Sequence, residues 1–346
     1  MRELERCERE IAAKFDNDDT LTESGTVVFT SGATESNYLA ITGSLNSRGN
    51  RTSSIVTTGM EHKSVSAAVA AAAQTHGTGN IEVITLPPPR LAADSKGTAV
   101  NSGDYESQIL SAVDGDTVLV SCMAVNNETG FCIDTRRLYK ELKQKNPRCV
   151  FHTDAAAGFT KTDVYGDLVS FSAHKFGGIA GVGGLFIRKG VRVRPVMAGG
   201  GQQGGLRGGT EPVALISAMT AAAGEEHISY DRQVVTPRDS GSALTSLLVQ
   251  KAQGMDGVSV NYAGVNIVSL CVHGAKSQVL VNALSERGIY VSAGSACNKG
   301  KKSEVLLAMG FAPATVDGTL RVSFGRENTA EEVYEFADAL SEVGII

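Results

Sequence analysis

The chain has 346 residues, 42% of them hydrophobic and 20% charged, with a formal net charge of −5 at pH 7. This length exceeds what one hydrophobic core usually serves, so we expect a large domain over 1–228 and a small C-terminal domain over 229–346. The negative charge gives no reason to expect a nucleic acid or an anionic membrane as partner, and no apolar run approaches the roughly 18 residues that span a bilayer.

The N-terminal residues and the cysteines indicate the cellular compartment in which the protein is expected. Residues 1–15 carry many charges of both signs, unlike a secretory signal or a transit peptide. The six cysteines are scattered without CxxC pairs or zinc spacing, which favours reduced thiols and no bound metal. Five of them fall in apolar or helical patterns typical of inert packing residues. We therefore expect a cytoplasmic protein, or one in another reducing compartment.

An amphipathic helix is expected first, over 2–15, followed by strands and helices in alternation. The predicted strands of the first domain are 26–30, 54–58, 81–86, 117–123, 149–153 and 169–172, with helices at 35–43, 64–74, 105–113 and 135–145. A glycine-rich loop at 199–205 and a helix at 211–226 follow. The second domain is predicted to contain helices 239–253, 277–287 and 330–343 and strands 266–272, 290–292 and 320–324.

This alternation, with strands that are apolar almost throughout, predicts a three-layer α/β fold. A mostly parallel sheet would be covered by helices on both faces, and a smaller α/β domain would follow it. Such sheets bind ligands at the carboxyl ends of their strands. Candidate functional residues follow the strands that end near residues 30, 58, 123, 153 and 172, so we expect one site at this edge.

Lys175 is the leading candidate for chemistry. It follows the apolar run Leu168-Val-Ser-Phe-Ser172 and precedes the turn Phe176-Gly-Gly178. Its neighbours are small, apolar or histidine, which suits an amine held partly out of water. Such an amine can bind an aldehyde cofactor as a Schiff base, although a solvated surface lysine fits the run equally well.

Three further strand ends carry polar candidates. Asp154 follows an apolar strand and precedes three alanines, which suits either a carboxylate paired with a ring nitrogen or the N-cap of a helix. His62 could stack on a flat cofactor, move protons or simply begin a helix. Asn127 offers amide donors to a ring hydroxyl or belongs to a turn.

Residues 29–37 read as a strand, a glycine turn and a helix start. The free N–H groups of that helix end, with the hydroxyls of Thr34 and Ser36, form an anion site suited to a phosphate. A capped helix without a ligand is the alternative.

Cys297 and Arg321 are the candidates in the second domain. Cys297 lies in a loop of small residues with several lysines after it, which favours an accessible thiolate over an ordinary surface cysteine. Arg321 lies within a strand pattern, where a charge is costly unless paired. It would bind a substrate carboxylate or form an internal salt bridge.

At this point the chain resembles the cysteine desulfurases, pyridoxal-phosphate enzymes of the class V aminotransferase family. The matching runs come in the family's order and span nearly the whole chain: 30–37, 61–63, 125–130, 152–154, 172–175, 199–201, 207–210, 294–297 and 321–326. The resemblance implies the fold type I of pyridoxal-phosphate enzymes and a homodimer.

The resemblance also implies roles at the cofactor. Lys175 would form the Schiff base, Asp154 would pair with the pyridine nitrogen and His62 would stack on the ring. The phosphate would be held by Ala33, Thr34, Ser172 and His174. Thr210 would reach the phosphate bound by the partner subunit.

For the substrate, the resemblance implies L-cysteine. Asn127 would contact the ring hydroxyl and the substrate, and Arg321 would hold the substrate carboxylate. Cys297 would take up the sulfur as a persulfide and leave alanine. A sulfur-acceptor or iron–sulfur scaffold protein would then receive the sulfur.

Two departures from the family pattern bear on activity. The family carries a glutamine three residues after the ring-nitrogen aspartate, where this chain has Ala157. Family members also begin several dozen residues earlier, so a fragment, a mis-started gene model and a degenerate paralogue stay open. A selenocysteine lyase and a catalytically compromised paralogue that binds sulfur acceptors are the alternatives to a desulfurase.

Overall fold

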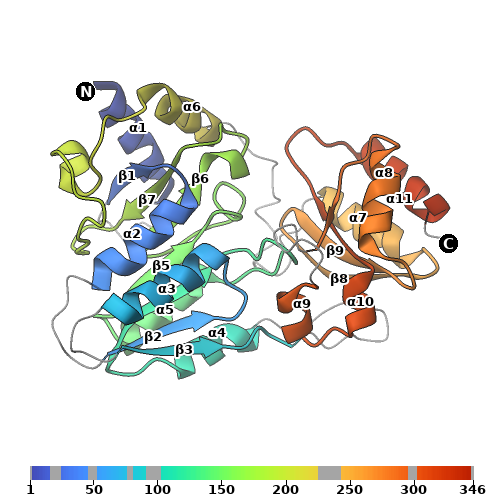
Figure 1. Ribbon diagram of the computed structural model, residues 1–346, viewed down its shortest axis with the longest axis horizontal. Coiled ribbons are helices and arrows are strands. Elements are labelled where there is room, and N and C mark those ends of the chain that lie inside the picture. The colour runs from blue at the N-terminus through green and yellow to red at the C-terminus, as the bar shows by residue number, and fades with distance from the viewer. Residues whose placement is uncertain are drawn as a thin grey trace. The chain divides into compact units, whose positions relative to one another are not determined.

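The computed structural model of the chain describes residues 2–15, 25–45, 53–75, 81–90, 103–224, 243–294 and 302–343. The chain divides into two compact units (Figure 1). The large unit holds Met1–Leu86, Glu106–Val125 and Asp134–His227, and the small unit holds Pro87–Tyr105, Asn126–Ile133 and Ile228–Ile346. Two segments that precede residue 228 thus cluster with the C-terminal part of the chain.

A seven-stranded sheet forms the centre of the large unit, in the order β1-β7-β6-β5-β4-β2-β3. Neighbouring strands from β6 to β3 run parallel, and β7 lies antiparallel between β1 and β6. The predicted α/β fold with a mostly parallel sheet is therefore confirmed. The strands are β1 Thr26–Thr30, β2 Ser53–Thr58, β3 Ile81–Leu86, β4 Thr117–Met123, β5 Val150–Asp154, β6 Leu168–Ser172 and β7 Gly183–Ile187.

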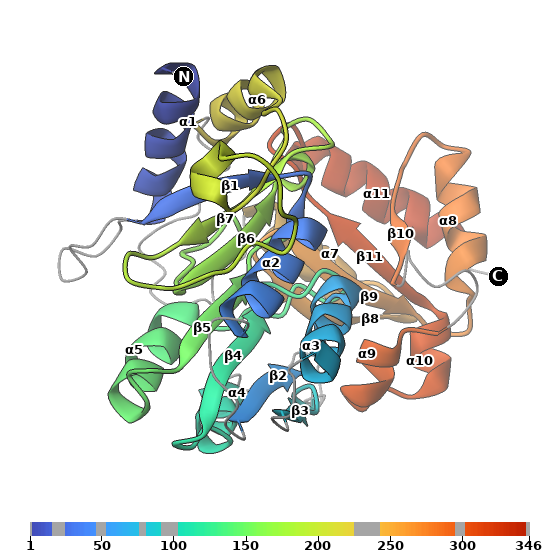
Figure 2. The same cartoon turned by 60° about the vertical axis from the view of Figure 1, so that its left-hand side comes forward.

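Two helices, α2 (Ala33–Leu45) and α3 (Lys63–Thr75), lie side by side on one face of this sheet (Figure 2). Apolar side chains of both helices pack on strand residues such as Ile55 and Leu119. Because α2 follows β1 and α3 follows β2, each helix starts at the carboxyl edge of the parallel strands. The other helices of this part of the chain are α1 Arg2–Ala12, α4 Gly103–Ser111, α5 Thr135–Lys145 and α6 Val213–Gly224.

Four phenylalanines fill the opposite face. Side chains alternate between the two faces of a strand, so Phe171 of β6 points away from Leu168, which packs under α2. The Phe171 ring stacks on Phe159 with a centroid distance of 4.6 Å, and Phe15 stacks on Phe186 at 4.5 Å. Burial on both faces explains why every residue of the inner strands β6 and β7 is shielded from solvent.

Strand β7 is not predicted from the sequence, because it begins with Gly183 and Gly184 and glycine weakens strands. The structure shows why glycine stands there. A Cβ on Gly184 would lie 2.4 Å from the Phe171 ring, and one on Gly183 would lie 2.5 Å from the Phe171 carbonyl oxygen. The close approach of β6 and β7 leaves no room for side chains at these positions.

The small unit is built on a four-stranded antiparallel sheet in the order β10-β11-β9-β8. Strand β8 is an addition to the predicted elements of this region. The strands are β8 Val258–Gly264, β9 Ile267–Val272, β10 Ser292–Ala293 and β11 Thr319–Ser323, and the helices are α7 Ala243–Gln253, α8 Ser277–Ser285, α9 Glu304–Ala308, α10 Pro313–Asp317 and α11 Ala330–Val343. Within the described ranges of both units, every helix is too short or too polar to cross a membrane.

The aromatic cluster generates a prediction about stability. Phe171→Ala removes a fully buried ring between Phe15 and Phe159, so we expect the free energy of unfolding to fall by about 3–5 kcal/mol. Urea denaturation measures this change. The control is Tyr290→Ala, since Tyr290 is 83% exposed, and it should change stability little. Equal losses in the two variants would contradict the proposed packing.

Candidate functional site

Asp154 is the last residue of β5 and lies at the carboxyl edge of the parallel strands. Its side chain is buried. Its Oδ2 accepts a hydrogen bond from Asn37 Nδ2 at 2.8 Å, and its Oδ1 accepts one from the Ala156 N–H at 2.9 Å. Burial raises the pKa of Asp154, while these hydrogen bonds, the charge of Lys175 and the charge that His62 carries when protonated act in the opposite direction.

His62 and Lys175 are near enough to Asp154 for their charges to act on its carboxyl group. His62 directly precedes α3, and its Nδ1 lies 2.7 Å from Ser64 Oγ. Lys175 ends the short 3-10 helix Ala173–Lys175 that follows β6, and its side chain is exposed. The structure thus brings together the three residues that the sequence points to for a cofactor ring.

A second group of predicted residues lies where β1 and β6 end. Helix α2 begins at Ala33, and the first N–H groups of a helix, here those of Ala33 and Thr34, have no acceptor within the helix. Ser172 Oγ lies 3.0 Å from His174 Nδ1, and a Cβ on Gly32 would lie 3.4 Å from the same Ser172 oxygen. Glycine therefore leaves a cradle between the helix start and Ser172 whose donors suit a phosphate.

Thr210 is exposed, in a segment that is anchored beside the start of α2. Arg207 Nε lies 3.0 Å from Glu35 Oε1, and both side chains are largely buried, at 20% and 17% exposure. Gln203 donates a hydrogen bond to the Phe29 carbonyl of β1 at 2.9 Å. These two contacts hold the glycine-rich segment against the large unit.

Ala157 lies in the turn that follows Asp154. Its carbonyl oxygen is 3.4 Å from Lys161 Nζ, which donates to it. Burial, and then the charge of Lys175, lower the pKa of Lys161 to about 8. The position that holds a glutamine in the family thus contributes only its backbone to a hydrogen bond.

In the small unit, Arg321 of β11 contacts the backbone of Asn127. Its Nη1 donates to the Asn127 carbonyl at 2.8 Å, and its Nη2 donates to Ser292 Oγ at 3.2 Å. The turn that carries Asn127 is held by Asn126, whose Oδ1 accepts from the N–H and the hydroxyl of Thr129 at 2.9 and 3.0 Å. The two predicted substrate-binding residues therefore meet within one unit.

Cys297 lies outside the described residues, so its reactivity stays a prediction. The other five cysteines are buried, and among the described residues they form no disulfide. Burial raises the pKa of Cys271 to about 11 and also raises the pKa of Cys122 well above its usual value. The thiols of Cys122 and Cys271 therefore stay protonated at neutral pH, as expected for packing residues.

Two residues that the sequence does not single out also line this region. Asn37 is fully buried in α2 beside Asp154. The carboxyl group of Glu61 is buried as well, and its Oε1 accepts from Thr58 Oγ1 at 2.5 Å and from the Met123 N–H at 3.0 Å. Burial raises the pKa of Glu61 to about 8, with a further contribution from the charge of Asp154. A polar residue on the apolar face of a predicted helix is the signal that could reveal Asn37.

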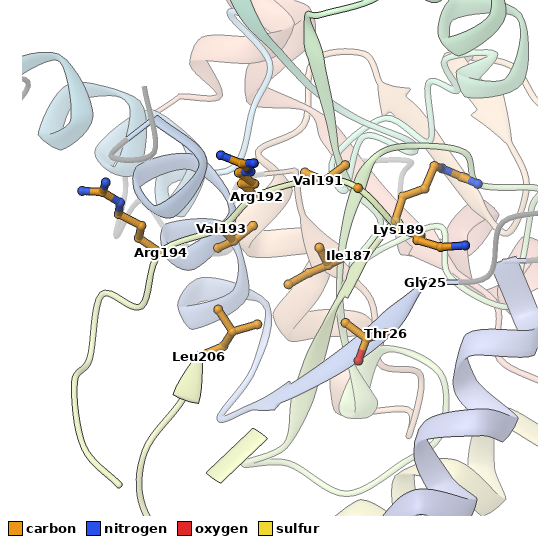
Figure 3. Close-up of a pocket in the computed structure, with 11 residues that line it drawn as sticks. Gly25, Thr26, Ile187, Lys189, Val191, Arg192, Val193, Arg194 and Leu206 are labelled. Atoms are coloured by element: carbon orange, nitrogen blue, oxygen red, sulfur yellow. The ribbon is translucent and has the colours of Figure 1, made fainter. Parts of the chain in front are cut away.

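A pocket of about 650 Å³ lies elsewhere on the large unit (Figure 3). It is lined by the start of β1 and by residues 187–194, which include Lys189, Arg192 and Arg194. The pocket sits where β1 begins and β7 ends, which is the amino edge of the parallel strands. It is therefore distinct from the edge that carries Asp154.

A family model described as aminotransferase class-V matches residues 3–336. The chain belongs to the class V aminotransferase family. The resemblance predicted from the motifs is thus confirmed over nearly the whole chain. The pyridoxal-phosphate cofactor of this family fits the residues present, because a buried carboxylate, a lysine and an anion cradle lie at the ends of neighbouring strands.

Relatives of this class V aminotransferase include cysteine desulfurases. It is 33% identical to a NifS/IcsS protein homolog of Lactobacillus delbrueckii, covering 92% of this chain and 81% of that one. It is also 33% identical to the cysteine desulfurase IscS of Methanosarcina thermophila, covering 93% and 77%. Among solved structures, a NifS-like protein matches with a TM-score of 0.78 and 30% identity, over 99% of this chain and 87% of that chain.

The buried Glu61 predicts a pH dependence of stability. Its pKa rises from 4.5 to about 8 on folding, so its stabilising effect is complete below pH 4.5 and is lost as the pH rises through about 8. Glu61→Gln removes this loss of stability at high pH, because the glutamine side chain does not titrate. Relative to the wild type, the free energy of unfolding of the variant should therefore increase by up to about 1.4 kcal/mol per pH unit across this interval.

Urea denaturation at a series of pH values measures the effect. Glu82→Gln is the matched control, because Glu82 is exposed on β3. Its stability should follow the wild type at every pH. If the Glu61→Gln curve also runs parallel to the wild type, Glu61 is ionised in the folded protein and the expectation is wrong.

Proposed function

We propose that the chain is a cysteine desulfurase that uses pyridoxal phosphate to convert L-cysteine to L-alanine. The observation that supports the proposal is that His62 and Lys175 lie near enough to Asp154 for their charges to act on its carboxyl group, in a chain that is 33% identical to a cysteine desulfurase. When bound, the pyridoxal ring supplies an electron sink for carbanion character at the substrate carbons.

The large unit supplies the groups that hold the cofactor. Lys175 binds the aldehyde through its amine, and Asp154 keeps a proton on the ring nitrogen. His62 stacks on the ring. The phosphate is bound by N–H groups and side chains of Ala33, Thr34, Ser172 and His174. The hydrogen bonds of Asp154 support its role, since they favour the ionised form that a protonated ring nitrogen requires.

The groups for the substrate come from the small unit. Arg321 binds the substrate carboxylate, and Asn127 contacts the ring hydroxyl and the substrate. The Cys297 thiolate attacks the sulfur of the substrate, so that the carbon–sulfur bond breaks and a sulfur–sulfur bond forms. The proton of the substrate thiol stays in the products, which are alanine and the Cys297 persulfide. A thiolate suits this step because it is a soft nucleophile.

The acceptor and the assembly are part of the same proposal. A sulfur-acceptor or iron–sulfur scaffold protein in a reducing compartment such as the cytoplasm receives the persulfide sulfur. The protein acts as a homodimer in which Thr210 reaches the phosphate bound by the partner subunit.

Thr210→Ala should then stay dimeric in sedimentation while cofactor affinity falls by about tenfold, the effect of one lost hydrogen bond to a charged group. An unchanged affinity would contradict this role of Thr210.

The central test uses the purified protein with added pyridoxal phosphate, L-cysteine and a thiol reductant. We expect a yellow protein that releases sulfide and alanine in equal amounts. Cys297→Ala should stay yellow and lose sulfide release, because only the acceptor thiol is removed. Lys175→Ala should lose the yellow colour of the lysine-bound cofactor.

The outcomes separate the alternatives. Alanine formation that persists in Cys297→Ala would contradict the persulfide step. Cofactor binding without any release would instead indicate a catalytically compromised paralogue that binds sulfur acceptors. Turnover of selenocysteine but not of cysteine would identify a selenocysteine lyase. A protein that stays colourless with pyridoxal phosphate would overturn the proposal as a whole.

A further inference from the structure

Four side chains of the large unit form one continuous series of hydrogen bonds, which we call the relay: Asp154, Asn37, Ser64 and His62. Asn37 Nδ2 lies 2.8 Å from Asp154 Oδ2 and 2.9 Å from Ser64 Oγ. Ser64 Oγ in turn lies 2.7 Å from His62 Nδ1. The relay joins β5 to α2, and α2 to the start of α3.

We propose that Asn37 and Ser64 are positioning residues that hold the proton of the neutral His62 ring on Nε2 while they orient the Asp154 carboxylate. The proposal deepens the proposed function and rests on it for the roles of Asp154 and His62. Neither Asn37 nor Ser64 needs to touch the cofactor or the substrate. Each acts through the residue to which it is hydrogen-bonded.

The orientation of the Asn37 amide is set by charge. With Nδ2 between Asp154 and Ser64, the buried Oδ1 has no hydrogen-bond partner in the described part of the chain. The flipped amide would place Oδ1 2.8 Å from a carboxylate oxygen, where two acceptors repel each other. An unpaired carbonyl oxygen costs less than an amide oxygen pressed against a buried carboxylate. The amide therefore donates at both contacts.

The direction of the remaining hydrogen bonds follows. Ser64 Oγ accepts from Asn37, so its own hydrogen is free to point at His62 Nδ1. The backbone N–H of Ser64 also donates to Nδ1, at 3.2 Å. Two donors thus converge on the lone pair of one ring nitrogen. A neutral imidazole carries a single proton, so that proton resides on Nε2.

This arrangement has a chemical consequence for the reaction. Nδ1 is occupied by two donors of the protein itself, so Nε2 is the ring nitrogen of His62 left to exchange protons with a bound molecule. At the other end of the relay, the Asn37 hydrogen bond favours the ionised form of Asp154 against the effect of burial. The Asn37 amide therefore supports both the ionised form of Asp154 and the Nε2–H tautomer of His62.

Nitrogen NMR of histidine-labelled protein tests the tautomer, with and without pyridoxal phosphate, and His62→Gln identifies the His62 signals. The wild type should show a proton on Nε2 and none on Nδ1. Ser64→Ala removes the hydroxyl donor and should raise the share of the Nδ1–H form by about tenfold. Ser64→Thr keeps the hydroxyl and should restore the wild-type signals. Ser66→Ala is the matched control, since Ser66 is exposed on the same helix.

Cofactor affinity, measured without substrate, tests the Asp154 end. Asn37→Leu removes both hydrogen bonds of the amide and should weaken pyridoxal-phosphate binding by about tenfold, while Ser64→Ala should leave the affinity within about twofold. A wild-type proton on Nδ1, or no change of tautomer in Ser64→Ala, would overturn the relay even if the desulfurase assay succeeds. If the desulfurase assay fails, NMR still measures the His62 tautomer. The proposed function and the relay can therefore be overturned independently. Should Asn37→Leu not fold, the Ser64 variants decide.

Discussion

The contact between Asn37 and Asp154 joins α2 to the end of β5, and the geometry of the large unit's site depends on it. A carboxylate that is removed from water is costly unless donors replace the lost solvent. Here the donors are the Asn37 amide and the Ala156 N–H. Apolar residues of α2 hold the helix on the sheet, so the amide meets the carboxylate at 2.8 Å. Packing and site geometry are therefore set by the same helix.

Because side chains alternate along a strand, polar residues and the aromatic cluster lie on opposite faces of the sheet. On β6, Ser170 and Ser172 share the α2 face with Leu168, while Phe171 points into the aromatic cluster on the other face. His152 of β5 lies between Ser121 Oγ at 2.8 Å and Ser170 Oγ at 3.0 Å. Burial lowers its pKa to about 3, so this histidine stays neutral and structural, in contrast to the exposed His62.

Two buried carboxyl groups lie near the ends of β2 and β5, and burial raises the pKa of both. Asp154 has two hydrogen-bond donors and the positive charge of Lys175 nearby, all of which favour its ionised form. Glu61 has a hydroxyl and an amide as donors but faces the negative charge of Asp154, and its pKa is about 8. The two groups therefore differ in the charge near them, which is positive at Asp154 and negative at Glu61. The hydrogen bonds of Glu61 to Thr58 and Met123 join β2 to β4.

The sequence by itself determined the family, the α/β class and the candidates Lys175, Asp154, His62 and Arg321. These depend on local patterns: apolar strands, glycine turns and polar residues that directly follow a strand. Only the tertiary structure revealed the contacts of Asn37 and Glu61 and the existence of β7. Asn37 and Asp154 are 117 positions apart, and no local pattern encodes a hydrogen bond between them. Likewise, position 184 of β7 requires glycine because the Phe171 ring occupies the space of a side chain there, and the pKa of Glu61 rises because other elements exclude water from it.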